Sequence, residues 1–350
     1  MKRGVLSLVC ICVFLSYTGC VGRDTGVSVG FADPERTVID GSGAVLKIPE
    51  SSDGITIASV YAAAVPFIAA LELSGQVLAV NVKSRFWTDT DESLAAAGTA
   101  GRGTVDLEAL AGFAPDVLIH RSNDAATVEA VQGKLGIPVL CINAESFDDV
   151  AATLVMMGRY FGREQRAAQV LEWLNGKFML IDEIAAGIPD EERVTALVMG
   201  GTLGRVAGGD MLQSWMIQKA GGICAASGTA SNRNWIDAGV EAVFRWNPDI
   251  IFCTSSTVLD YSPESLIEDP AWSAVSAVKD GRVYTIPAKI DSWDLPGISC
   301  ALGTMYMLNR MYPDHFTDEQ LRQEIDEYYI FMFGKTFDNS YLGYSLFAQE

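Results

Sequence analysis

The sequence predicts an α/β fold with two lobes, each built on a mostly parallel sheet, and one long helix that bridges them. Three observations support this prediction. Short apolar runs alternate with helical periodicity in both halves of the chain, as they do in βαβ units. One segment at 105–123 recurs in altered form at 238–256. Between the two copies, an apolar pattern with helical spacing runs without proline from 164 to 187.

The composition is that of a globular protein. The chain has 350 residues, of which 49% are hydrophobic and 20% are charged, and this length allows two separate cores. The net charge of -19 would repel a phosphate backbone, so we do not expect nucleic acid as a partner. The sequence contains no P-loop and no histidine beside a plausible nucleophile. We therefore do not expect an enzyme.

Residues 1–20 have the features of an export signal. Lys2 and Arg3 precede an apolar run from 5 to 17, which is too short to span a bilayer comfortably. The run ends in Tyr-Thr-Gly-Cys, which is similar to a lipobox, so we expect Cys20 to carry a lipid. The protein would then be anchored to the outer face of the cell membrane, and an uncleaved anchor would tether it in the same place. Residues 21–50 are expected to form a spacer and an edge element.

The first lobe is expected over residues 51–163. Its apolar runs predict strands at 55–60, 77–80, 116–119 and 139–142. Helical spacing predicts helices over 62–73 and 147–161. The pattern from 164 to 187 then predicts a helix of about 35 Å, at 1.5 Å per residue. Because that length exceeds the size of a small lobe, we interpret it as an interlobe helix, with an ordinary surface helix as the alternative.

The second lobe and a tail are expected over residues 188–350. Apolar runs again predict strands, at 194–199, 250–253 and 283–286. Helical patterns cover 211–220, 302–311 and 321–333, and the aromatic tail from 334 has little pattern.

The repeated segment is the most informative motif. The first copy has the sequence VDLEALAGFAPDVLIHRSN, and the second has AGVEAVFRWNPDIIFCTSS. Glu108 corresponds to Glu241, and both fall in the first turn of a predicted short helix, where the helix dipole favours a carboxylate. A proline then ends the helix, and an aspartate leads into a buried strand.

The doubled motif resembles the periplasmic-binding-protein family that serves ABC importers of iron-siderophore, haem and cobalamin complexes. Three further segments resemble the same family in order: FGREQRAA at 161–168, GGDML at 208–212 and DPAWSAVSAVKDGRVY at 269–284. The resemblance covers about residues 55–316. It implies two Rossmann-like lobes bridged by a long helix. It also implies that Glu108 and Glu241 dock onto arginines of the importer's permease, through charge-assisted pairs that set orientation.

The ligand site is predicted from loops. In an open parallel sheet, ligands bind beyond the carboxyl ends of the strands. The loops expected there are rich in aromatic and arginine side chains, which suit a large anionic metal chelate. We expect ligand contacts from six residues: Tyr61, Arg85, Trp87, Arg121, Trp235 and Trp293.

Bare metal and cofactor binding are not expected. The chain has only two histidines, so a three-histidine zinc site is impossible. Apart from Cys20 and two signal cysteines, the chain contains four widely spaced cysteines, which leave room for one disulfide: Cys141, Cys224, Cys253 and Cys300.

The sequence thus predicts a monomeric substrate-binding lipoprotein of an ABC importer. It would capture an iron-siderophore, haem or cobalamin-type chelate between its lobes and deliver it to the membrane permease. Two alternatives remain open. A metallocluster or reductase-type enzyme on a similar two-lobed fold would need cysteines around a shared site. A surface sensor would use the same fold without an importer.

Overall fold

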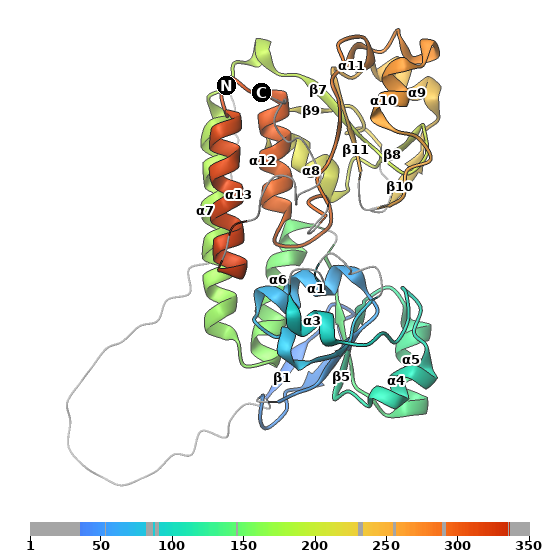
Figure 1. Ribbon diagram of the computed structural model, residues 1–350, viewed down its shortest axis with the longest axis vertical. Helices are drawn as coiled ribbons and strands as arrows, with labels where there is room; N and C mark the ends of the chain where they lie inside the picture. The colour runs from blue at the N-terminus through green and yellow to red at the C-terminus, as the bar shows by residue number, and fades with distance from the viewer. Residues whose placement is uncertain are drawn as a thin grey trace, which may run out of the picture. The chain divides into compact units, whose positions relative to one another are not determined.

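The computed structural model describes residues 36–52, 54–81, 87, 91–144, 146–229, 234–254, 257–288, 292–334 and 336. The expected signal, the lipid-attachment residue Cys20 and most of the aromatic tail lie outside these ranges. Two sheets, separated in sequence by a long helix, organise the described chain (Figure 1). The predicted α/β class with two Rossmann-like lobes is therefore confirmed.

The first lobe is built on a four-stranded parallel sheet with the order β4-β3-β5-β6. Its strands are β3 (Ile57–Ser59), β4 (Val77–Ala79), β5 (Val117–Arg121) and β6 (Val139–Ile142). Its α-helices are α1 (Val65–Ala70), α3 (Glu92–Ala96), α4 (Leu107–Phe113), α5 (Ala125–Leu135) and α6 (Phe147–Tyr160). An antiparallel hairpin of β1 (Thr37–Ile39) and β2 (Val45–Lys47) precedes them.

Helix α7 (Glu164–Ala186) is the predicted interlobe helix. It runs beside both lobes in Figure 1, with α13 (Asp318–Phe333) alongside it. Between these helices the Lys177 ammonium lies 2.5 Å from the Glu324 carboxylate and 2.6 Å from that of Glu327. The rings of Trp173 and Phe331 stack with an interplanar angle of 8°. Side-chain contacts along its length therefore hold α7 against its neighbour.

The second lobe is built on a sheet in which β7, β9, β11 and β12 are parallel, while β8 and β10 form an antiparallel edge. The strands are β7 (Thr195–Met199), β8 (Arg205–Ala207), β9 (Ile223–Cys224), β10 (Trp235–Asp237), β11 (Ile250–Cys253) and β12 (Val283–Thr285). The α-helices are α8 (Leu212–Lys219), α9 (Val240–Trp246), α10 (Pro263–Glu268), α11 (Ser276–Lys279) and α12 (Cys300–Met311).

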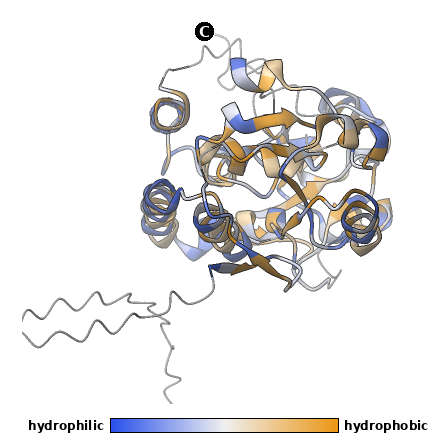
Figure 2. Ribbon diagram, turned by 90° about the horizontal axis from the view of Figure 1, so that it is seen from below, coloured by the Kyte–Doolittle hydropathy of each residue, from blue (hydrophilic) through white to orange (hydrophobic). Residues whose placement is uncertain are grey.

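Apolar side chains concentrate on the strands. Figure 2 shows hydrophobic residues on the central strands and hydrophilic ones on outward turns of the surrounding helices. All four residues of β6 and of β11 are buried, as expected for strands covered on both faces. Among the residues that the structure describes, no helix combines the length and apolar character needed to cross a bilayer.

The doubled motif has the same geometry in both lobes. Helices α4 and α9 each have seven residues and end at a left-handed residue, Ala114 with φ 46° and Asn247 with φ 44°. The Asp116 carboxylate accepts a hydrogen bond of 2.8 Å from the backbone N–H of Thr56. The Asp249 carboxylate accepts the equivalent bond, also of 2.8 Å, from Thr195. Each aspartate thus ties the start of its strand to the start of a neighbouring strand.

Candidate functional site

A cavity of about 260 Å³ opens between the two lobes. It is lined by residues at the beginning of α6, from the first lobe, and by residues around the beginning of α8, from the second lobe: Ser146, Phe147, Asp148, Gly209, Asp210, Met211, Leu212, Trp215 and Gln218. Helix α6 follows the carboxyl end of β6, and α8 follows the loop after β8. This is the region in which an open α/β sheet is expected to bind ligands.

Local interactions position the first-lobe side of the cavity. The Ser146 hydroxyl accepts a hydrogen bond from the backbone N–H of Asp149 and so caps α6. Asp148 lies in the first turn, where the helix dipole stabilises its carboxylate. Its exposed side chain is therefore held at the mouth of the cavity.

A glycine turn positions the second-lobe side. At Gly209, a Cβ atom would lie 2.6 Å from the carbonyl oxygen of Ala226, so only glycine fits there. The backbone N–H of Met211 donates to the carbonyl of Gly208 over 3.0 Å, and α8 then begins. Met211, the N-cap residue of α8, forms no side-chain hydrogen bond to the first turn. The backbone N–H groups at the start of α8 make this end of the cavity suitable for a hydrogen-bond acceptor or an anionic group.

An aromatic cluster forms the wall of the cavity and joins three elements. The ring of Phe147, at the start of α6, stacks on Trp215 of α8 with centroids 5.8 Å apart and planes 3° from parallel. Phe178 of α7 contacts both rings, at 4.5 Å and 5.3 Å between centroids. Lys219 of α8 forms an ion pair of 2.7 Å with Asp182 of α7 beside them. Both lobes therefore pack against the interlobe helix at this wall.

Three of the predicted ligand residues lie near strand ends but do not line this cavity. Tyr61 follows β3 and is half-buried against the core. Arg121 ends β5, with its side chain 46% exposed, and pairs with Asp124 over 3.3 Å. Trp235 begins β10, and its half-buried ring covers Gly200, whose Cβ would lie only 3.0 Å from the ring. Arg85 lies outside the described residues.

Trp87 and Trp293 correct a prediction, since we expected their rings to lie open in cleft loops. Their exposed fractions are 3% and 1%, and both belong to the hydrophobic core. Trp87 packs on Phe333, with ring centroids 5.3 Å apart. The indole N–H of Trp293 donates to the hydroxyl of Tyr329 over 3.4 Å. In this structure neither ring presents a face to the interlobe cavity.

The reason for the burial of Trp293 is the neighbouring Asp294. Its carboxylate is fully buried and accepts hydrogen bonds from the hydroxyls of Ser292 and Thr254. Its backbone carbonyl accepts a bond of 2.7 Å from the side-chain amide of Gln213 in α8. These bonds draw the loop that follows residue 291 into the second lobe, because a buried carboxylate needs partners.

His120 forms a buried polar pair at the carboxyl end of β5. Its Nε2 lies 3.0 Å from the Asp124 carboxylate, and its side chain is 1% exposed. Its buried Nδ1 has no hydrogen-bond partner among the described residues. Burial lowers the pKa of His120, and this effect outweighs the opposing effect of Asp124. The imidazole is therefore held in its neutral form at neutral pH, with Nε2–H donating to Asp124.

The four remaining cysteines do not form a shared site. All four are buried and none of them forms the disulfide that the sequence left open: Cys141, Cys224, Cys253 and Cys300. Burial raises the pKa of Cys141 to about 11 and that of Cys253 to about 12, so both remain thiols. In the described part of the chain, no group of three or more histidine, cysteine or carboxylate side chains could hold a metal ion. This arrangement lends no support to a metallocluster enzyme.

The two carboxylates of the doubled motif occupy matching surface positions. Glu108 and Glu241 are both exposed, and each is the second residue of its seven-residue helix. Asp106 caps α4 with bonds of 3.0 Å to two backbone N–H groups, whereas Gly239 begins α9 with a positive φ of 79°. The helix caps thus differ, but each lobe places a glutamate carboxylate at the same position of its helix.

The interlobe cavity residues were missed by the sequence analysis. GGDML was noted as a segment that resembles the family, and Phe147 was assigned to a helix by its spacing. No local signal indicated that Phe147 and Trp215 would meet.

Comparisons with known proteins agree with this geometry. Residues 57–290 match the family model described as periplasmic binding protein. An uncharacterized ABC transporter substrate-binding lipoprotein of Bacillus subtilis, YvrC, is 26% identical over 62% of this chain and 68% of its own. The molybdate-binding protein MolA of Haemophilus influenzae is 22% identical over 64% of this chain and 66% of its own.

Solved structures share the fold. A periplasmic solute binding protein from Veillonella parvula superposes with a TM-score of 0.72 at 21% identity, covering 88% of this chain and 95% of that chain. MolA bound to molybdate gives a TM-score of 0.75 at 18% identity, with coverages of 86% and 99%. Helicobacter pylori CeuE in a nickel-histidine complex gives 0.70 at 18% identity, with coverages of 88% and 97%.

Proposed function

Because the chain belongs to the periplasmic binding protein family of ABC-transporter substrate-binding proteins, we propose that it captures an iron-siderophore, haem or cobalamin-type chelate. It would then deliver this ligand to the permease of an ABC importer. The observation that carries the proposal is the interlobe cavity, whose walls come from both lobes. A ligand held there would contact the two lobes at once.

The chemistry of the cavity supports a chelate. The stacked rings of Phe147 and Trp215 offer an aromatic wall for a macrocycle or a catecholate. The start of α8 offers backbone N–H donors to ligand oxygens. Asp148 and Asp210 line the same cavity and can accept hydrogen bonds from ligand O–H or N–H groups. At about 260 Å³, the cavity would take one part of a large chelate.

Binding of a panel of chelates tests this ligand class. Ferric siderophores, haemin and cobalamins would be titrated into the full chain while tryptophan fluorescence is followed. We expect one of them to bind, and Trp215→Leu to weaken that binding roughly tenfold through loss of aromatic contact. Val258→Ala, at an 87% exposed position, is the matched control and should leave affinity unchanged. Failure of the whole panel to bind would refute the chelate proposal.

A small oxyanion is the second candidate, favoured by the start of α8 at a small cavity. MolA, one of the similar proteins, is named for molybdate. Asp148 and Asp210 line the same space and would repel a free anion, which is why we place the chelate first. Titration with molybdate in the same assay separates the candidates, because saturable binding of molybdate alone would reverse their order.

We further propose that Glu108 and Glu241 dock the loaded protein on the permease. Exposed carboxylates at matching positions of two lobes can each pair with an arginine and so set the orientation of the complex. Glu108→Lys combined with Glu241→Lys should abolish ligand uptake by cells that carry the importer. Ligand affinity in solution should not change, because neither side chain lines the cavity.

A matched pair of charge reversals controls this experiment. Glu129 in α5 and Glu268 in α10 are also exposed, one in each lobe. Changing both to lysine alters the net charge by the same amount and should leave uptake intact. If the Glu108 and Glu241 variant transports normally, the docking proposal fails.

Location and assembly complete the proposal. We propose that Cys20 carries the lipid that anchors a monomer to the outer face of the membrane. Cys20→Ala should move the protein from the membrane fraction to the soluble extracytoplasmic fraction. Retention of the variant in the membrane would indicate an uncleaved signal anchor instead.

A further inference from the structure

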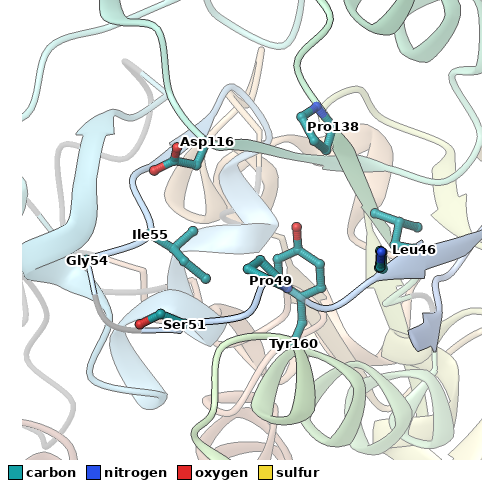
Figure 3. Close-up of a pocket in the computed structure, with 9 residues that line it drawn as sticks. Leu46, Pro49, Ser51, Gly54, Ile55, Asp116, Pro138 and Tyr160 are labelled. Carbon is teal, nitrogen blue, oxygen red and sulfur yellow. The ribbon is translucent and has the colours of Figure 1, made fainter. Parts of the chain in front are cut away.

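A second cavity, of about 460 Å³, lies at the opposite end of the first-lobe sheet (Figure 3). Ile55, Asp116 and Pro138 line it, and these residues precede β3, β5 and β6 respectively. The cavity therefore sits where the parallel strands begin, whereas the interlobe cavity lies beyond their carboxyl ends. Its volume is in the range of small-molecule sites.

The phenol of Tyr160 points into this cavity (Figure 3). Tyr160 is the last residue of α6, and its side chain is only 3% exposed. None of the residues that the structure describes hydrogen-bonds to its hydroxyl. Burial raises the pKa of Tyr160, and the nearby Asp116 carboxylate adds to the effect, so the phenol stays neutral. The neutral hydroxyl is therefore available to form hydrogen bonds with a molecule in the cavity.

Asp116 provides a charged acceptor on the same cavity. Its Oδ2 accepts hydrogen bonds of 2.8 Å and 2.7 Å from the backbone N–H and hydroxyl of Thr56. These bonds hold the carboxylate in place and lower the pKa of Asp116, so it is ionised at neutral pH. They leave the second oxygen, Oδ1, to accept from a ligand.

The second lobe contains an internal comparison. Tyr312 directly follows α12, much as Tyr160 ends α6. Its hydroxyl donates to the carbonyl of Gly221 over 3.0 Å and accepts from the N–H of Val194 over 3.2 Å. Backbone groups thus satisfy the phenol in the second lobe, while the corresponding phenol of the first lobe faces an open space.

We propose that the first-lobe cavity binds a small zwitterion that carries an ammonium and a carboxylate group on a short apolar body. The ammonium would donate to Asp116 Oδ1 and to the Tyr160 hydroxyl. Lys47 of β2 lines the same cavity as Asp116. Lys47 would therefore meet the carboxylate.

The rest of the lining suits the apolar body of such a ligand. Four apolar residues line the cavity together with the two charged groups: Leu46, Pro49, Ile55 and Pro138. A ligand with a single charge would leave either Asp116 or Lys47 without a partner in the site. This is why we infer a zwitterion and not a simple amine or carboxylic acid.

The test uses 6-aminohexanoate as the probe, with hexylamine and hexanoate as singly charged analogues. Calorimetric titration of the full chain should show that the zwitterion binds at least roughly tenfold more tightly than either analogue. Tyr160→Phe, which removes one hydroxyl, and Lys47→Met should each weaken binding roughly tenfold. Lys134→Met, at an exposed lysine at the end of α5, should leave binding unchanged.

Two outcomes would overturn the proposal. If 6-aminohexanoate does not bind at millimolar concentration, the cavity holds only water. If it binds but both Tyr160→Phe and Lys47→Met retain full affinity, the zwitterion occupies another site. The thermal midpoint of each variant should match that of the unchanged protein, which separates loss of binding from loss of folding.

Discussion

Trp215 and Phe147 stack face to face across the two lobes, with ring centroids 5.8 Å apart and planes within 3° of parallel. One ring belongs to α8 of the second lobe and the other to α6 of the first. Both also touch Phe178 of the interlobe helix. The lobes are thus coupled by packing at the interlobe cavity as well as by the chain that joins them.

The stack predicts measurable coupling between its two rings. Phe147→Leu and Trp215→Leu should each lower the free energy of unfolding by about 1–3 kcal/mol. The double variant should lose less free energy of unfolding than the two single variants lose together. The difference, the coupling energy, should be about 0.5–1.5 kcal/mol. Urea denaturation of the four proteins measures this energy. Strict additivity would mean that the stack does not connect the lobes in solution.

The two lobe-end tyrosines should respond differently to loss of their hydroxyl groups. Tyr312→Phe removes the bonds to Gly221 and Val194 and should lower the free energy of unfolding by about 1–3 kcal/mol. Tyr160→Phe removes a hydroxyl without a partner among the described residues and should change it by less than about 0.5 kcal/mol. Equal destabilisation in urea would show that the Tyr160 phenol has a structural partner.

Asp116 should contribute to acid unfolding. Hydrogen bonds from Thr56 lower the pKa of Asp116 in the folded state below its ordinary value. The folded state therefore binds fewer protons than the unfolded state, and this stabilisation is complete above about pH 4. It is lost as the pH falls through the folded pKa. In Asp116→Asn, the free energy of unfolding should fall less steeply with pH in this acidic range. An unchanged slope in the variant would contradict the role given to Asp116.

His120 should give stability a second dependence on pH. Because burial lowers the pKa of His120 in the folded state, its contribution is complete above about pH 6.5 and is lost as the pH falls through the folded pKa. Protonation would place a charge on a buried ring whose Nδ1 has no partner among the described residues. Thermal midpoints measured between about pH 8 and pH 5 should fall less steeply in His120→Gln. A slope equal to that of the unchanged protein would refute this prediction.

Regular elements could be predicted well because their signals are local. The strand expected at 139–142 is β6 (Val139–Ile142), and the helix expected at 164–187 is α7 (Glu164–Ala186). The short antiparallel edge of β8 and β10 was not predicted. Trp235 was assigned to a loop. Its strand, β10, was missed because the pairing of β10 with β8 depends on residues distant in sequence.

The candidate site was harder to predict than the fold. Trp87 and Trp293 lie in segments that the sequence marked as cleft loops, yet both rings are buried in the core. The burial of Trp293 depends on Asp294, whose partners come from three separate segments of the second lobe. Periodicity carries no information about which distant hydroxyl or amide will satisfy a buried carboxylate.

The sequence by itself determined the α/β elements, the doubled Glu-to-Pro-Asp motif and the family resemblance, because these depend on local periodicity and on the order of residues along the chain. Only the tertiary structure decided that Phe147 meets Trp215, that Trp293 belongs to the core, and that Tyr160 faces a cavity while Tyr312 does not. The physical reason is close packing. Whether a side chain is covered, stacked or open is set by atoms that chain folding brings from elsewhere in the sequence.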